Sequence, residues 1–359
     1  MLMPVAKKIL FDAERMKYPN TGLYHFCYQL SKALIHAMHE TDMQLQVFGP
    51  ASCKVNFSEN TDWRPVEFWH KFLLPTAADI SVWHTSNQDS EYFPFGFKNP
   101  ILFTIHDLNY YHDQRKPLAK RKAWLQAVQA KVNASSYISF ISQHTFNDVQ
   151  GLINLTNKPT AVIYNGCNII GNYLLTNPQY QPAKPFIFSI GTIAEKKNFH
   201  VLPALLCNNE YELVIAGITQ QEWYKQKIMD EAIALGVEDR IVFTGPVSEN
   251  DKQWYYANCA AFLFPSLVEG FGLPVVEAMY FGKPIFISNN TSLPEIGGDA
   301  VYIFNSFDLV QMQERFNEGM KDYAINNRVE QIKKRAQFFN WQTAAEQYVQ
   351  IYQQLIATK

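Results

Sequence analysis

The strongest constraint on the fold is a regular alternation of short apolar runs with segments of helical periodicity. In the first half of this 359-residue chain there are six runs of four to six residues. Apolar residues recur at helical spacing after the first run, and two further helix candidates lie between the last three runs. Such runs are typical of strands buried on both faces, and alternation with helices favours a parallel, helix-covered sheet. The predicted strands are Lys8–Ala13, Leu45–Phe48, Ile80–Trp83, Ile101–Ile105, Tyr137–Ile141 and Ala161–Tyr164.

Residues 171–185 interrupt this alternation with three prolines and little periodicity, which is typical of a linker. The alternation then restarts, so a second parallel sheet is expected. A chain of this length also suits two hydrophobic cores better than one. We therefore predict two doubly wound Rossmann-like domains, residues 1–170 and 186–337, facing each other across a cleft. The strands predicted for the second are Phe186–Ile190, Leu213–Ala216, Ile241–Thr244, Ala261–Phe264, Pro284–Ser288 and Val301–Phe304.

Residues 264–284 carry the strongest functional signal. The run from Ala261 to Phe264 leads into a loop with Glu269, Gly270 and Gly272, and Pro274 stands where a helix can begin. A glycine loop before a helix N-terminus offers backbone N–H groups that favour an anion. Seven residues separate Glu269 from Glu277, which is expected in the first helical turn. The pattern predicts a site for a nucleotide-sugar diphosphate, in which Glu277 accepts ribose hydroxyls and Glu269 faces the sugar.

This run, from Phe264-Pro265-Ser266 to Gly282-Lys283-Pro284, resembles the Glu-x7-Glu signature of the family-4 retaining glycosyltransferases, also called glycosyl transferases group 1. The resemblance implies the α/β GT-B fold and sugar transfer from a nucleotide-diphosphate sugar to a hydroxyl, with retention. It also implies a C-terminal helix, within residues 338–359, that packs back on the N-terminal domain. The donor-binding residues that it implies in the second half, beside the two glutamates, are Thr192, Lys196, Lys197, Gly270, Phe271, Gly272 and Leu273.

Two adjacent lysines, Lys196 and Lys197, follow the predicted strand Phe186–Ile190 and supply cations for a diphosphate. The family commonly has Pro-Arg-Lys here, and this chain has Glu195 and Lys196 at the places of the proline and the arginine, so Lys197 is the firmer correspondence. We expect Lys197 to stabilise the leaving diphosphate and to act in catalysis together with Glu269.

Three loops of the first half hold further candidates. His106 ends the strand Ile101–Ile105 and resembles the family histidine that contacts the donor sugar, so we expect it in the active site. His84 and Asn87 follow another strand, where cleft-facing roles and local hydrogen bonds are both open interpretations. Gly22 stands where the family often has a Gly-Gly pair near the donor phosphate, and it is a candidate donor contact.

Composition bounds the chemistry further. The formal charge of −2 does not favour nucleic acid, and five scattered cysteines argue against a zinc site or disulfide framework and for a reducing compartment. No signal peptide or membrane span is predicted, so we expect a cytoplasmic protein. The chain has no Asp-x-Asp pair, so we expect no metal and no other cofactor.

Five basic residues lie within eight positions, which favours either a solvated helix face or contact with an anionic membrane or lipid-linked acceptor. They are Arg115, Lys116, Lys120, Arg121 and Lys122. The segment Gly191–Asn198 resembles that of mannosyltransferases with a guanosine donor, and the resemblance favours a role in polysaccharide or lipopolysaccharide biosynthesis. A nucleotide-sugar epimerase of the GT-B fold and a non-catalytic nucleotide-sugar sensor remain alternatives.

Overall fold

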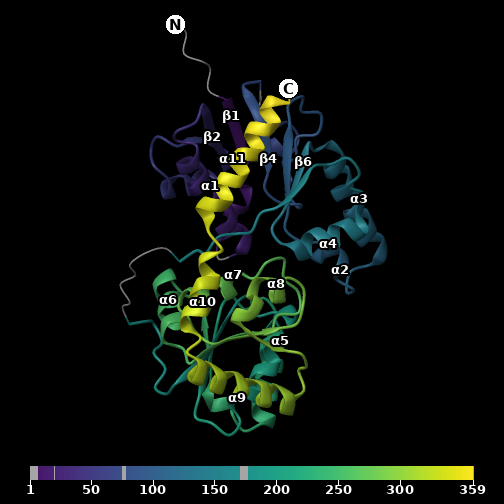
Figure 1. Ribbon diagram of the computed structural model, residues 1–359. Helices are drawn as coiled ribbons and strands as arrows, with labels where there is room; N and C mark the ends of the chain where they lie inside the picture. Colours follow the sequence, from purple (N-terminus) through teal and green to yellow (C-terminus); the bar gives the residue numbers. More distant parts are fainter. Residues whose placement is uncertain (1–6, 20, 75–77, 170–176, 359) are drawn as a thin grey trace. The chain divides into compact units, whose positions relative to one another are not determined.

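The computed structural model describes residues 7–19, 21–74, 78–169 and 177–358. The chain divides into two compact units: unit 1 comprises residues 1–166 and 340–359, and unit 2 comprises residues 167–339. Each unit is built on one parallel β-sheet with helices packed on it (Figure 1). The division between the units lies close to the domain limits expected at residues 170 and 338.

Unit 1 contains a seven-stranded sheet in the order β3-β2-β1-β4-β5-β6-β7, and all neighbouring strands pair in parallel. Six strands correspond to predicted ones. The seventh, β3, was missed, because its sequence Asp-Trp-Arg-Pro has no apolar run; it lies at the sheet edge, where a proline is tolerated. The strands are β1 (Lys7–Asp12), β2 (Met43–Gly49), β3 (Asp62–Pro65), β4 (Ile80–Thr85), β5 (Ile101–Ile105), β6 (Tyr137–Phe140) and β7 (Thr160–Val162).

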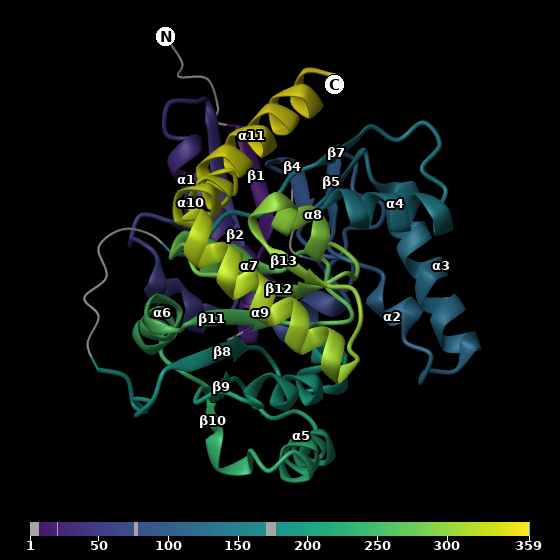
Figure 2. The ribbon, with the colours of Figure 1, turned by 60° about the horizontal axis from the view of Figure 1, so that its bottom comes forward.

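The sheet of unit 2 has six parallel strands in the order β10-β9-β8-β11-β12-β13 (Figure 2). Alternate side chains of each central strand enter two separate cores: Phe186 and Phe188 of β8 lie in one, and Ile187 lies in the other. Both faces of the sheet are therefore covered, as continuous apolar strands require. The strands are β8 (Phe186–Ile190), β9 (Glu212–Ala216), β10 (Ile241–Gly245), β11 (Ala261–Phe264), β12 (Ile285–Ser288) and β13 (Tyr302–Phe304).

The helices connect successive strands, apart from those at the end of the chain. Those of unit 1 are α1 (Gly22–Ala37), α2 (Asn109–His112), α3 (Leu118–Ala134), α4 (Gln143–Leu152) and α11 (Trp341–Ala357). Those of unit 2 are α5 (Glu222–Ala234), α6 (Glu249–Asn258), α7 (Leu273–Tyr280), α8 (Leu293–Gly297), α9 (Leu309–Asn326) and α10 (Val329–Gln337).

The last helix, α11, packs against α1 and β4 of unit 1, and Figure 1 shows it alongside α1. Trp341 contacts the ring of Phe26, with the ring centroids 5.9 Å apart. A Cβ atom on Gly166 would lie only 2.2 Å from the backbone nitrogen of Trp341, so glycine permits this close passage.

Part of the predicted linker 171–185 lies outside the described residues. Its described part is held to unit 2 through Glu212 of β9. The Tyr180 hydroxyl donates to Glu212 at 2.5 Å, and the Lys184 backbone N–H donates to it at 2.9 Å.

Candidate active site

Glu269 and Lys197, which are 72 positions apart in the chain, meet at the carboxyl ends of β8 and β11. The Lys197 ammonium forms an ion pair with Glu269 Oε1, and the Ser266 hydroxyl lies 2.6 Å from the same oxygen. The side chains of Lys197 and Glu269 are 12% and 17% exposed, so both retain an accessible surface. Lys197 Nζ also lies 4.9 Å from the centroid of the Phe264 ring. The structure thus joins two predicted site residues and adds Ser266, for which no role was predicted.

Two side chains next to α8 hold the glycine loop in place. The Thr291 hydroxyl accepts the Glu269 backbone N–H at 3.0 Å, and the Ser292 hydroxyl lies 3.0 Å from the Glu269 carbonyl oxygen and 2.9 Å from that of Phe271. Gly272, with φ +108°, is the N-cap of α7, and a Cβ there would lie 2.7 Å from Leu293 Cδ2. No side chain among the described residues caps this helix start. The amide groups at the start of α7 are thus arranged for an anion.

The prediction that Glu277 lies in the first turn of this helix is wrong. The helix begins at Leu273, with Pro274 at its second position, so Glu277 is the fifth residue and lies in the second turn. Its side chain is buried and accepts three hydrogen bonds. The donors are Asn168 Nδ2 at 2.9 Å, Lys252 Nζ at 3.2 Å and the Tyr256 hydroxyl at 3.0 Å.

None of these three donors was predicted, although the sequence pattern around Lys252 could have indicated one of them. The buried residues of α6 are Lys252, Tyr255 and Tyr256, followed by Cys259 just after the helix. Their spacing is that of a core-facing helical stripe, in which a lysine is anomalous. A lysine in such a stripe could have been recognised as the partner of a buried acid.

The two adjacent lysines differ in their surroundings. The Lys196 side chain is exposed, and its carbonyl oxygen accepts the Leu267 N–H at 2.8 Å. Lys197, by contrast, passes Gly191, where an added Cβ would come within 3.2 Å of Lys197 Cε. Thr192, the residue after Gly191, is half-buried. Of the two lysines, Lys197 is therefore the one whose ammonium is held by neighbouring side chains.

His106 of unit 1 is buried immediately after β5. Its Nε2 lies 2.9 Å from the Ser86 carbonyl oxygen, so Nε2 carries the proton and Nδ1 is the acceptor. Burial lowers the pKa of His106 to about 4, although the hydrogen bond to Ser86 acts in the opposite direction. At neutral pH this imidazole is uncharged, and it can accept a hydrogen bond but cannot act as an acid.

His84 and Asn87 form hydrogen bonds with other residues of unit 1. His84 lies 2.6 Å from the Tyr352 hydroxyl through Nδ1 and 2.7 Å from Thr104 Oγ1 through Nε2, and burial lowers its pKa to about 3. The side chain of Asn87 accepts the Asp89 backbone N–H at 2.9 Å. The contacts of Asn87 are local, whereas His84 is bonded to Tyr352 of α11, 268 positions away, so both side chains have partners within unit 1. Gly22 is the exposed first residue of α1, and no described atom lies within 4 Å of an added Cβ.

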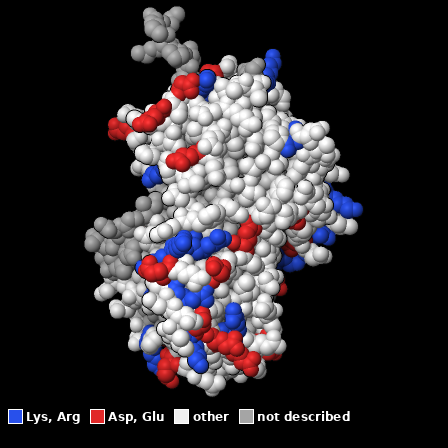
Figure 3. Space-filling model, viewed as in Figure 1, with Lys and Arg blue, Asp and Glu red and all other residues white. Residues whose placement is uncertain are grey.

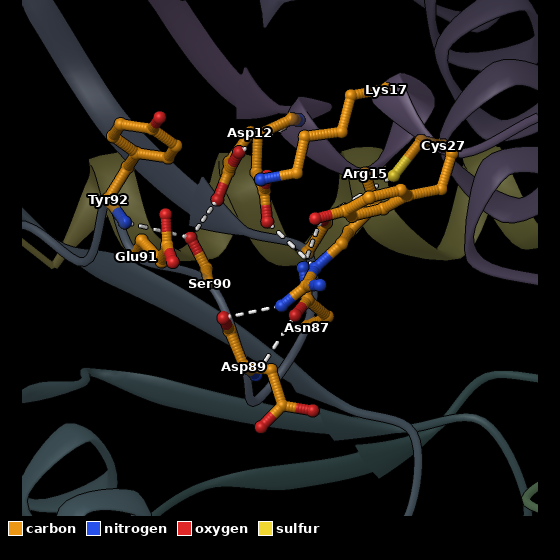
Figure 4. A network of polar contacts seen from close by, with 12 residues as sticks. Asp12, Arg15, Lys17, Cys27, Asn87, Asp89, Ser90, Glu91 and Tyr92 are labelled. Atoms are coloured by element: carbon orange, nitrogen blue, oxygen red, sulfur yellow. Dashed lines mark hydrogen bonds and ion pairs between the residues drawn. The ribbon is translucent and has the colours of Figure 1, made fainter. Parts of the chain in front are cut away.

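A polar network that was not predicted joins the ends of β1 and β4, where the strand order of unit 1 reverses (Figure 4). Asp12 is fully buried and accepts the Ser90 hydroxyl at 2.5 Å, and Arg15 donates to the Asp89 carbonyl oxygen at 2.6 Å. Burial, together with the charge of Glu14, raises the pKa of Asp12 to about 7. Reversal points of parallel sheets are where ligands bind in this fold class, and here the network holds the two loops together.

Two solved structures share the fold of this chain. Sucrose-phosphate synthase from Thermosynechococcus elongatus superposes with a TM-score of 0.77 over 98% of this chain and all of that one, at 18% identity. Anabaena HepE in complex with UDP and glucose superposes with a TM-score of 0.67 over 98% of this chain and 99% of that one, also at 18% identity. The predicted GT-B fold is confirmed.

Residues 177–338, nearly all of unit 2, match the family model described as glycosyl transferases group 1. Unit 2 therefore belongs to this family. The O-antigen chain mannosyltransferase B of Escherichia coli is 24% identical over 97% of this chain and its own full length. The prediction of a glycosyltransferase is thus confirmed.

Two further observations concern the described residues of both units. They contain no helix with the length and apolar character needed to cross a bilayer. They also contain no cluster of three or more His, Cys, Asp or Glu side chains arranged to bind a metal ion.

Proposed function

We propose that this glycosyltransferase moves mannose from a guanosine diphosphate sugar to a hydroxyl of a glycan or lipid-linked acceptor during cell-surface polysaccharide synthesis. The observation that carries the proposal is the accessible Lys197–Glu269 pair beside the glycine-capped start of α7. This arrangement offers a cation and backbone N–H groups to a diphosphate, and a carboxylate to a sugar. The similarity to the mannosyltransferase of Escherichia coli supports the sugar and the type of acceptor.

In the proposed reaction, the bond between the sugar C1 and the phosphate oxygen breaks while C1 bonds to the acceptor oxygen on the same face. The acceptor proton passes to the leaving phosphate, so no protein nucleophile is needed. Lys197 and the amides of Gly270–Leu273 stabilise the charge that develops on the diphosphate, with Lys196 and Thr192 as further donor contacts. Glu277 binds the ribose. His106, as a neutral hydrogen-bond acceptor, contacts the donor sugar, and Gly22 is a further donor contact.

The direct test incubates the purified protein with GDP-mannose, UDP-glucose and other nucleotide sugars, each with and without a mannose-terminated oligosaccharide, in the presence of EDTA. We expect an acceptor-dependent product from GDP-mannose, retention of the anomeric configuration, and activity that survives chelation, because lysine and amide groups neutralise the diphosphate. Interconversion of donors without acceptor would identify an epimerase, and binding without turnover would identify a sensor. Complete loss of transfer in EDTA, restored by manganese or magnesium, would contradict the role of the lysines.

We also propose that the protein lies in the cytoplasm and contacts an anionic membrane through the segment Arg115–Lys122. Lys120 and Lys122 are exposed on α3, whereas Arg115 is paired with Asp113 and Arg121 donates to the Tyr111 carbonyl oxygen. Residues 115–122 include no acidic residue. By contrast, basic and acidic side chains alternate over unit 2 on the face shown in Figure 3.

The double variant Lys120→Ser/Lys122→Ser should bind phosphatidylglycerol vesicles about 10- to 30-fold more weakly, because each lysine contributes about 1 kcal/mol at an anionic surface. Sedimentation with vesicles measures this. The control is Lys321→Ser/Lys334→Ser, which removes two exposed lysines of unit 2. Equal loss in both double variants, or equal binding to phosphatidylcholine, would rule out a dedicated membrane contact.

A further inference from the structure

Lys252 is a buried lysine next to the carboxylate proposed to bind ribose. The residue is 6% exposed and occupies a core-facing position of α6. Lysine is rarely buried unless it is paired with an opposite charge, because removing an ammonium group from water is costly. An apolar side chain would fill this position without that cost. Packing alone therefore does not explain why a lysine occupies this position.

Its two ion pairs differ in their surroundings. Lys252 Nζ lies 2.8 Å from Glu249 Oε2, in a side chain that is 58% exposed, and 3.2 Å from Glu277 Oε1, in a side chain that is 5% exposed. Water solvates Glu249, so that carboxylate needs no partner. Glu277 is buried and does need one. Among the described residues, Lys252 is the cation that forms an ion pair with Glu277.

The remaining donors to Glu277 are neutral. Asn168 donates to Oε1 and Tyr256 donates to Oε2, so the two groups orient the carboxylate without balancing its charge. A carboxylate has about four acceptor positions, and described residues occupy three here, which leaves about one for a ribose hydroxyl. Orientation and charge are thus supplied by different side chains.

We propose that Lys252 is a positioning residue for nucleotide recognition, whose ammonium balances the charge of Glu277 and holds its carboxylate in place to accept a ribose hydroxyl. This inference rests on the proposed role of Glu277 in binding the donor. Lys252 acts through Glu277, since its own ammonium is already shared by two carboxylates.

The groups facing Glu277 make the idea testable by pH. They are Lys252 and Tyr256 of α6 and the Cys167 thiol. Burial acts to lower the pKa of Lys252, but the charges of Glu277 and Glu249 outweigh it, so the net shift is upward. Burial raises the pKa of Tyr256 well above its usual value and that of Cys167 to about 12. None of these three groups therefore changes charge between about pH 6 and about pH 8.

The test compares binding of GDP with binding of 2′,3′-dideoxy-GDP, which lacks both ribose hydroxyls, by calorimetry. The unsubstituted protein should bind GDP at least about tenfold more tightly than the dideoxy analogue. Lys252→Met should bind GDP about tenfold more weakly and the analogue almost unchanged, so that the preference for ribose disappears. Lys252→Arg, which keeps the charge, should retain most of that preference.

The pH arm separates charge from packing. GDP affinity of Lys252→Met should fall from about pH 8 to about pH 6 more steeply than that of the unsubstituted protein, because an unpaired buried carboxylate takes up a proton and accepts fewer hydrogen bonds. The control is Lys184→Met, which breaks the exposed pair with Glu210 in the same unit and should change neither measurement. If Lys252→Met does not fold, Lys252→Gln serves, since it removes the charge but keeps a donor.

Equal weakening of both nucleotides in Lys252→Met, or a preference for ribose that survives, would overturn the inference while leaving the glycosyltransferase proposal intact. If the unsubstituted protein does not distinguish ribose from dideoxyribose, the ribose role of Glu277 itself is wrong. If it binds UDP and not GDP, the proposed guanosine donor is wrong, and the same comparison with UDP and its dideoxy analogue tests Lys252.

Discussion

Replacing Lys197 by alanine is expected to lower the turnover number about 10²- to 10³-fold, with a much smaller change in the Michaelis constant for the donor. The reason is that charge on the diphosphate grows as the sugar–phosphate bond breaks, so a fixed cation stabilises the transition state more than the bound donor. Lys197 can act in this way because Glu269 and the Phe264 ring hold its ammonium in place. Steady-state kinetics with saturating acceptor measures both constants.

Two companion variants define what Lys197 does. Lys196→Ala removes an adjacent lysine whose side chain is exposed, and its loss of turnover should be clearly smaller. Glu269→Gln keeps the lysine but removes its charged partner. If the double variant Lys197→Ala/Glu269→Gln has a turnover number no lower than that of Lys197→Ala alone, Lys197 and Glu269 act as one unit. A Lys197→Ala enzyme in which only the Michaelis constant changes would show that the lysine binds the donor and does not assist the leaving group.

Replacing Glu277 by alanine should have two effects of similar size. Donor binding should weaken by about 1.5–3 kcal/mol, or roughly 10- to 150-fold, because ribose hydroxyls lose a charged acceptor. The free energy of unfolding should also fall, by about 3 kcal/mol, because the buried Lys252 keeps only the exposed Glu249 as its partner. Calorimetry with a nucleoside diphosphate and chemical denaturation measure the two effects separately.

A second substitution separates binding from folding in this experiment. The double variant Glu277→Ala/Lys252→Met removes the unpaired cation, so stability should recover in large part while nucleotide binding stays weak. Glu277→Gln keeps the shape of the side chain and serves if the alanine variant is too unstable to measure. Unchanged donor affinity in a folded Glu277 variant would contradict the ribose role.

Much of the fold could be predicted from the sequence because its elements are encoded locally. The apolar runs that form β5, β8 and β11 are followed by a histidine, a glycine and a proline, respectively, so their limits were predicted to the residue. The strand β3 was not predicted, because an edge strand needs little apolar surface and is held mainly by backbone pairing with β2. The order of strands within each sheet comes from pairings between distant segments, which no local pattern records.

Some features of the candidate site could likewise be predicted from the sequence, and others depended on the tertiary structure. The glycine loop and the start of α7 were recognised because Gly272 and Pro274 have backbone roles tied to their positions, and the resemblance to group 1 glycosyltransferases placed Glu269 and Lys197 in one site. The ion pair between them, 72 residues apart in sequence, required the fold to be seen.

The surroundings of each side chain depended on tertiary packing. From the sequence, Glu277 was a carboxylate near a helix start, and the structure shows it buried among Asn168, Lys252 and Tyr256. His84 was open to two interpretations until Tyr352 of α11 was seen to contact it. Backbone conformation follows from nearby residues, whereas burial, charge pairing and protonation depend on which distant segments pack together. The strands, the glycine loop and the family resemblance could therefore be predicted from local sequence. The partners of the buried acids and lysines could be identified only from the folded structure.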